Sequence, residues 1–97
     1  MLSGKNRSYL TGEANELDPV IHIGKEGVTE AVVEQVEELL EIHELIKGRV
    51  LDNAPKGVKD VAHDLAEKTE ASVVQVIGSV FVIFKTNPEE SNYNIDN

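Results

Sequence analysis

The sequence predicts an α/β fold, a two-layer sandwich in which helices cover a four-stranded mixed sheet. Three stretches repeat their apolar residues at helical spacing, and four short apolar or β-branched stretches alternate with them in the order α-β-α-β-α-β-β. Strands separated by helices are joined by right-handed parallel crossovers. The first three strands should therefore run parallel, and the fourth should run antiparallel to them. A chain of 97 residues has room for one such domain.

The first helix is expected at about residues 4–17. Leu10, Ala14 and Leu17 fall at i, i+4 and i+7, on one stripe of a helix. The helix must end near Asp18, because the residue before a proline is pushed out of helical space.

The first strand and the second helix come next in the chain. The segment 19–23 is short, rich in β-branched residues and followed by a glycine, and this pattern predicts a strand. The second helix is expected at about residues 29–42, with Thr29 as its N-cap, as Ser3 is for the first helix. Most of its solvent face is glutamate: Glu30, Glu34, Glu37, Glu38 and Glu41.

The second half of the chain contains the clearest patterns. A strand at 45–51 and a loop at 52–57 precede a third helix, whose apolar residues are Val58, Val61, Ala62, Leu65 and Ala66. Two further strands, at 73–77 and 80–84, flank Gly78 and Ser79. Glycine at the first central position is what a type II′ hairpin turn requires. These two strands should pair antiparallel.

The sequence predicts one folded domain followed by a tail, in a protein of the cytoplasm. Residues 1–85 form the domain, and residues 86–97 are a flexible, acidic tail with little apolar surface. There are no cysteines, the N-terminus has no apolar stretch behind its basic residues, and no segment approaches the roughly 18 apolar residues of a membrane span. We therefore expect a cytoplasmic protein without a membrane partner.

The charge balance disfavours indiscriminate binding to nucleic acid. Nine Lys and Arg face eighteen Asp and Glu, a formal charge of −9, and non-specific binding depends on phosphate neutralisation. The charges are unevenly placed, because the segment from Glu26 to Ile46 holds seven acids and no Lys or Arg. The molecule should be electrostatically two-sided.

The loop Gly24-Lys25-Glu26-Gly27 is the main candidate site. It joins a strand end to a helix N-terminus, where free N–H groups and the helix dipole favour a phosphate, and Lys25 adds a positive charge. From spacing alone, a plain turn that needs glycine for its dihedral angles is an equally good interpretation.

Further basic residues are candidates for phosphate contacts. Lys5 and Arg7 lie on the first turn of the first helix, and Lys47 and Arg49 alternate on one face of the second strand. For each of them ordinary solvated surface is the alternative, and only convergence beside Gly24 would make a site.

Catalysis and metal binding are weak alternatives. Asp60, His63, Asp64 and Glu67 share one helix, but a solvated helical face with local ion pairs explains them better. The positions of His22 and His43 do not indicate a nucleophile or a set of oxyanion donors. We therefore expect no enzyme, no cofactor and no metal.

Five pieces in a specific order resemble the stand-alone bacterial YhbY-type CRM (chloroplast RNA splicing and ribosome maturation) domain, over residues 1–85. The pieces are Leu2-Ser3-Gly4-Lys5, Pro19 before a strand, the stretch Ile23 to Glu30, the stretch His43 to Lys47, and Val74-Gln75-Val76-Ile77-Gly78.

The resemblance implies a fold like the C-terminal domain of translation initiation factor three. It also implies RNA contact through the Gly-x-x-Gly loop and association with ribosomal RNA of large-subunit precursors. We expect a ribosome assembly factor that acts as a monomer, with ribosomal proteins as possible further partners. The residues themselves leave one other function open, a protein-interaction module that docks a basic partner on the acidic face of the second helix.

Overall fold

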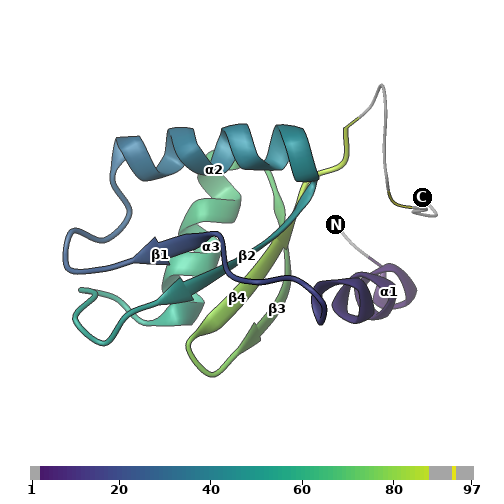
Figure 1. Cartoon of the computed structure of the whole chain (residues 1–97), viewed down its shortest axis with the longest axis horizontal. Helices are drawn as coiled ribbons and strands as arrows, with labels where there is room; N and C mark the ends of the chain where they lie inside the picture. Colours follow the sequence, from purple (N-terminus) through teal and green to yellow (C-terminus); the bar gives the residue numbers. More distant parts are fainter. Residues whose placement is uncertain (1–2, 88–92, 94–97) are drawn as a thin grey trace.

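The computed structural model describes residues 3–87 and residue 93. Its elements follow the expected α-β-α-β-α-β-β order (Figure 1): α1 Gly4–Ala14, β1 Ile21–Ile23, α2 Glu30–His43, β2 Leu45–Val50, α3 Val58–Thr69, β3 Ser72–Ile77 and β4 Val80–Phe84. Within the described residues, no helix is long and apolar enough to cross a membrane.

The four strands form one mixed sheet in the order β1-β2-β4-β3. β1 and β2 are parallel, and β4 pairs antiparallel with both β2 and β3. β1, β2 and β3 therefore share one direction, as expected. The position of β4 between β2 and β3 was not predicted from the sequence. The short hairpin accounts for β4 lying beside β3, and the pairing of β4 with β2 on its other edge places it between the two.

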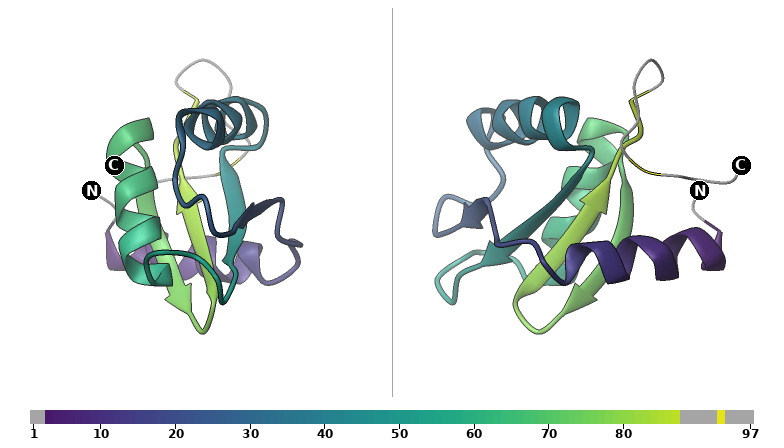
Figure 2. Two further views of the ribbon diagram at one scale, coloured as in Figure 1. Left: turned by 90° about the vertical axis from the view of Figure 1, so that its left-hand side faces the viewer. Right: turned by 45° about the vertical axis from the view of Figure 1, so that its right-hand side comes forward.

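The helices cover both faces of the sheet. α2 and α3 pack on one face over a core that includes Ile23, Leu65 and Phe81, and together with the sheet they form the predicted sandwich. α1 packs on the opposite face over a second core that includes Leu10, Leu45 and Val82. In the right-hand view of Figure 2, α1 lies in front of the sheet and α3 behind it. The two-layer prediction did not include this third, partial layer.

Both predicted N-caps are present. The Ser3 hydroxyl accepts a hydrogen bond from the Asn6 N–H at 3.1 Å, and the Thr29 hydroxyl accepts one from the Val32 N–H at 3.2 Å. α1 ends at Ala14, three residues earlier than expected. Leu17 still packs against the second core, because a turn whose Leu17 N–H bonds to the Ala14 carbonyl at 3.0 Å carries it there.

The hairpin between β3 and β4 has the predicted turn. Of its two turn residues only Gly78 has a positive φ, +59°, which is the sign that a type II′ turn requires at its first central position. The Ser79 carbonyl accepts a hydrogen bond from the Val50 N–H at 2.8 Å. The hairpin tip is therefore fixed beside the end of β2.

Glu44 holds the chain that follows β4. It is 1 % exposed, has a φ of +63°, and its carboxylate accepts a hydrogen bond from the Asn87 N–H at 2.8 Å. Farther along, the Tyr93 ring meets the Phe84 ring edge-on, with 5.8 Å between centroids. The expected flexible tail falls mostly on residues 88–92 and 94–97, outside the described residues, so the division at residue 85 stays a prediction.

Candidate nucleic-acid interface

The loop Gly24-Lys25-Glu26-Gly27 forms a tight turn at the C-terminal end of β1. The Gly27 N–H donates to the Gly24 carbonyl at 3.0 Å, which closes the turn over the two central residues. Lys25 and Glu26 are both exposed at its tip. The turn therefore projects one cation and one anion from a closed backbone.

The turn rests on a second loop, residues 51–57, between β2 and α3. The Leu51 N–H donates to the Ile23 carbonyl at 2.8 Å. A Cβ atom added to Gly27 would lie 3.0 Å from Cγ of Pro55, and the φ of Gly27 is +69°. Figure 1 shows the two loops side by side, beyond the ends of β1 and β2. The absence of a side chain at Gly27 thus permits both the positive φ of the turn and the close contact between the two loops.

Two helices, α2 and α3, begin close to this pair of loops. At α2, Thr29 satisfies the N–H groups of Val32 and Val33, which leaves those of Glu30 and Ala31 without partners inside the helix. At α3 the N-cap is Gly57, which has no side chain to cap the helix. Both ends carry the positive pole of a helix dipole, so the region favours an anion.

A hollow of about 220 Å³ lies between the two loops. Lys56, Gly27 and Pro55 line it, together with the carboxylate residues Glu26 and Asp64. Lys56 is exposed, as Lys25 is, so each of the two loops contributes a cation. The sequence pattern does not single out Lys56. The sequence shows it only as part of a turn, and its place beside Gly27 depends on packing between segments about thirty residues apart.

The structure brings Arg49 close to the loop. Arg49 is paired with His22, which precedes Gly24 by two residues, so Arg49 lies about 7 Å along the strand from the turn. Its side chain is exposed. Lys47 lies on the same face, two residues farther from the loop, and is half-buried. These residues extend the basic region from the loop onto the sheet.

Lys5 and Arg7 lie elsewhere. The Arg7 guanidinium donates to the Val73 carbonyl of β3 at 3.4 Å. Val73 pairs with Ile83 of β4, and Ile83 pairs with Ile46 of β2, so the three residues lie in one row across the sheet. Ile46 is four residues, or about 13 Å, from the end of β2 that lies beside the glycine loop. β3 is also three strand spacings, about 14 Å, away from β1. The structure therefore does not bring the start of α1 to the glycine loop.

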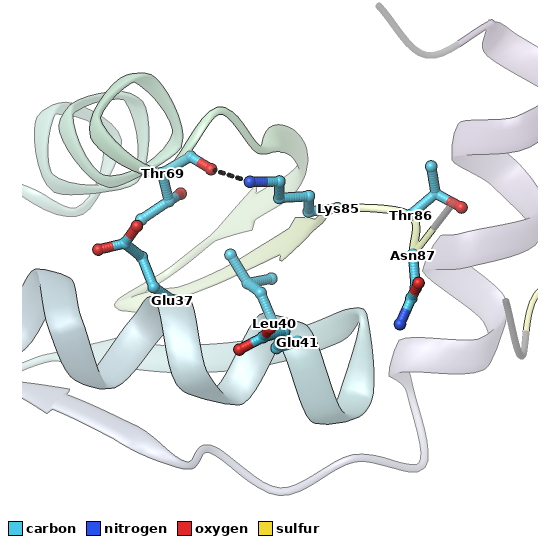
Figure 3. A pocket seen from close by; sticks show the side chains of 7 residues that line it. All are labelled: Glu37, Leu40, Glu41, Thr69, Lys85, Thr86 and Asn87. Carbon is cyan, nitrogen blue, oxygen red and sulfur yellow. Dashed lines mark hydrogen bonds between the residues drawn. The ribbon is translucent and has the colours of Figure 1, made fainter. Parts of the chain in front are cut away.

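A different surface lies at the other end of the sheet. A pocket of about 510 Å³ between α2 and the chain after β4 is lined by Glu37, Glu41 and Lys85, among others (Figure 3). The Lys85 ammonium donates to the Thr69 carbonyl at 3.0 Å, at the end of α3. This acidic pocket and the glycine loop therefore lie at different places on the molecule.

One carboxylate of α3 forms a local ion pair. Asp64 pairs with Lys68 at 2.6 Å, one helical turn away. Within residues 3–87 and residue 93, no group of three or more His, Asp or Glu side chains is placed to hold a metal ion.

Comparison with known proteins assigns the family. The model of the CRS1/YhbY (CRM) domain matches residues 2–85, nearly the whole chain. The chain belongs to the CRM domain family. The region matched includes every element of the sheet and both loops of the candidate site.

Individual relatives match this chain over most of their length. The Bacillus subtilis protein YqeI, named as a probable RNA-binding protein, is 36 % identical over 95 residues, which cover 98 % of this chain and 99 % of the relative. An RNA-binding protein of Haemophilus influenzae is 34 % identical and covers 91 % of this chain and 89 % of its own length. The solution structure of a Staphylococcus aureus protein superposes with a TM-score of 0.80 at 41 % identity, over 99 % of this chain and 98 % of that one.

Proposed function

We propose that this CRM domain binds RNA, and that the loop Gly24-Lys25-Glu26-Gly27 contacts the phosphate backbone. The observation that carries the proposal is the convergence of Lys25, Lys56 and Arg49 from three separate segments around one closed glycine turn. A glycine turn at a helix N-terminus lets backbone N–H groups approach phosphates closely, as in other Gly-x-x-Gly clamps. The names of the relatives support RNA as the partner.

The proposed RNA is ribosomal, within precursors of the large subunit. The resemblance to YhbY-type domains supports this choice. The net charge of −9 favours a defined site over coating of any RNA, because a protein with few phosphate contacts gains little from counterion release. The proposed role is that of a ribosome assembly factor in the cytoplasm, acting as a monomer without cofactor or catalysis. In this role Glu26 limits non-specific attraction at the loop tip.

Crosslinking in cell extract tests the proposal. Protein crosslinked to RNA by ultraviolet light is purified, and the attached RNA is sequenced. We expect enrichment of large-subunit ribosomal RNA, with crosslinks lost in the variant Lys25→Glu. Association with precursor particles should fall as salt is added. Random messenger RNA fragments in place of ribosomal RNA would reject the ribosomal part of the proposal.

The same extract separates RNA binding from docking of a basic protein. α2 presents the exposed residues Glu34, Glu38 and Glu41 on the acidic side of the molecule. If particles are bound through a basic ribosomal protein, reversing these charges to lysine should abolish association, whereas Lys25→Glu should not. RNA binding at the loop predicts the reverse pattern.

A further inference from the structure

Half of the sheet face that carries α1 is open. On β2 and β3, residues whose side chains point to this face become more exposed from the core under α1 towards the end of the sheet beside the glycine loop and the hairpin. On β2, Leu45 is buried, Lys47 is half-buried and Arg49 is exposed. On β3, Val74 is 3 % exposed and Ile77 is 62 % exposed. Figure 1 shows the β3–β4 hairpin and the ends of β1 and β2 extending past α1.

One row of residues crosses this open half. His22, Arg49, Val80 and Ile77 are aligned by pairing across β1, β2, β4 and β3, so their side chains share a face; we call these four residues the open sheet face. The row ends beside Gly24 on β1 and beside the hairpin turn on β3. It is therefore continuous with the loop proposed to bind phosphate.

The charge of the strands differs from that of the molecule. None of the Asp and Glu residues that the structure describes lies in a strand, whereas Lys47 and Arg49 do, in a chain of net charge −9. The open sheet face thus combines an exposed guanidinium with exposed aliphatic surface and no carboxylate. A phosphate chain that also offers apolar base faces has the complementary chemistry, and unpaired RNA has both.

We propose that the open sheet face binds an unpaired stretch of RNA that continues from the glycine loop. Arg49 meets a phosphate, with His22 beside it, and a base or ribose packs on Ile77 and Val80. This inference rests on the proposed RNA binding at the loop and adds the class of RNA, because a duplex hides the faces of its bases. It also assigns a binding role to aliphatic residues at the hairpin end.

Binding of two RNA probes tests the inference. One probe is a labelled oligouridine of about 12 nucleotides, which stays unpaired, and the other is an RNA duplex of about the same length. Ile77→Ser should weaken oligouridine binding by about three- to tenfold and leave its salt dependence unchanged, because no charge is removed. Duplex binding should not respond. Arg49→Gln should weaken oligouridine binding and lower the salt slope by about one contact.

Ile42→Ser is the matched control. Ile42 is 66 % exposed, close to the 62 % of Ile77, but it lies on α2 and is not part of the open sheet face. Its substitution should leave both affinities unchanged. In the wild-type protein, the methyl resonances of Ile77 and Val80 should shift when oligouridine is added, and that of Ile42 should not. This second measurement does not depend on the folding of any variant.

The outcomes separate this inference from the loop proposal. If Lys25→Gln weakens oligouridine binding but Ile77→Ser behaves like Ile42→Ser, the loop proposal stands and the open sheet face is not an RNA site. If neither variant changes binding, both are wrong. If Ile77→Ser instead breaks up a dimer seen in sedimentation, with RNA affinity unchanged, the face contacts a second copy of the chain and the inference is overturned.

Discussion

Gly27 and Pro55 meet across the two loops of the candidate site. A Cβ atom at Gly27 would lie 3.0 Å from Cγ of Pro55, and the φ of +69° at Gly27 already disfavours any side chain. The loop that is proposed to contact RNA is therefore held in shape by the loop that carries Lys56. A change at Gly27 disturbs both.

Gly27→Ala is expected to cost about 1 to 2 kcal/mol of folding free energy, from the positive φ and the close contact with Pro55. Gly12→Ala is the matched control. Gly12 is in α1 with open space around it, so alanine there should stabilise the protein by about 0.5 to 1 kcal/mol. Urea unfolding measures both. Equal effects of the two substitutions would contradict the strained-turn account.

Leu65→Ala should be strongly destabilising. Leu65 is 0 % exposed and lies on α3, facing the sheet among the residues of the larger core. Removing its side chain leaves a cavity and should cost about 2 to 5 kcal/mol, a large part of the stability of a small domain. Leu51→Ala provides the comparison, because Leu51 is 42 % exposed and should cost much less. An unfolding midpoint unaffected by Leu65→Ala would show that α3 does not pack as described.

Ionisation of Tyr93 should couple to stability at high pH. Burial, and secondarily the nearby carboxylates of Glu13 and Glu44, raises the pKa of Tyr93 above its ordinary value of 10.0. The folded state then holds the phenolic proton more tightly than the unfolded state does. The contribution of Tyr93 to stability is therefore fully present below about pH 10, and it is lost as the pH rises through the folded pKa.

The absorbance of the phenolate measures this titration directly. The chain has two tyrosines, so Tyr9→Phe leaves Tyr93 as the single reporter. We expect its midpoint to lie above that of the unfolded protein in denaturant. In addition, Tyr93→Phe should reduce the loss of stability above pH 10. Identical midpoints in folded and unfolded protein would mean that Tyr93 does not pack on Phe84 in solution.

Local patterns predicted the helices and strands well. The apolar stripe of α3 and the caps Ser3 and Thr29 depend on neighbours within one or two turns, which a sequence displays directly. The end of α1 was misplaced because Leu17 keeps the helical spacing while a turn carries it onto the same core. Apolar spacing indicates which side chains are buried, and it does not distinguish a helix from the turn that follows it.

The strand order and the contacts between distant loops depend on long-range packing. The sequence contains no signal that places β4 between β2 and β3, or that seats Pro55 on Gly27, because each depends on segments distant in the chain. For the same reason Lys56 was missed, and Lys5 and Arg7 were grouped with a loop that lies at the opposite corner of the sheet. The turn from Gly24 to Gly27 agrees with the predicted strand-to-helix loop, since its glycine spacing and its position are local features, and its role in binding stays a prediction.

The central claim is that Lys25 meets a phosphate. Its most direct test is the salt dependence of ribosomal RNA binding by Lys25→Glu, compared with Lys85→Glu. Both variants change the net charge equally, but Lys85 lies at the end of β4 against the Thr69 carbonyl, away from the loop. We predict that Lys25→Glu weakens binding to every competent RNA about equally and lowers the slope of log affinity against log salt by about one contact, while Lys85→Glu leaves the slope unchanged. Unchanged affinity and slope for Lys25→Glu, in a protein that remains folded, would contradict the account.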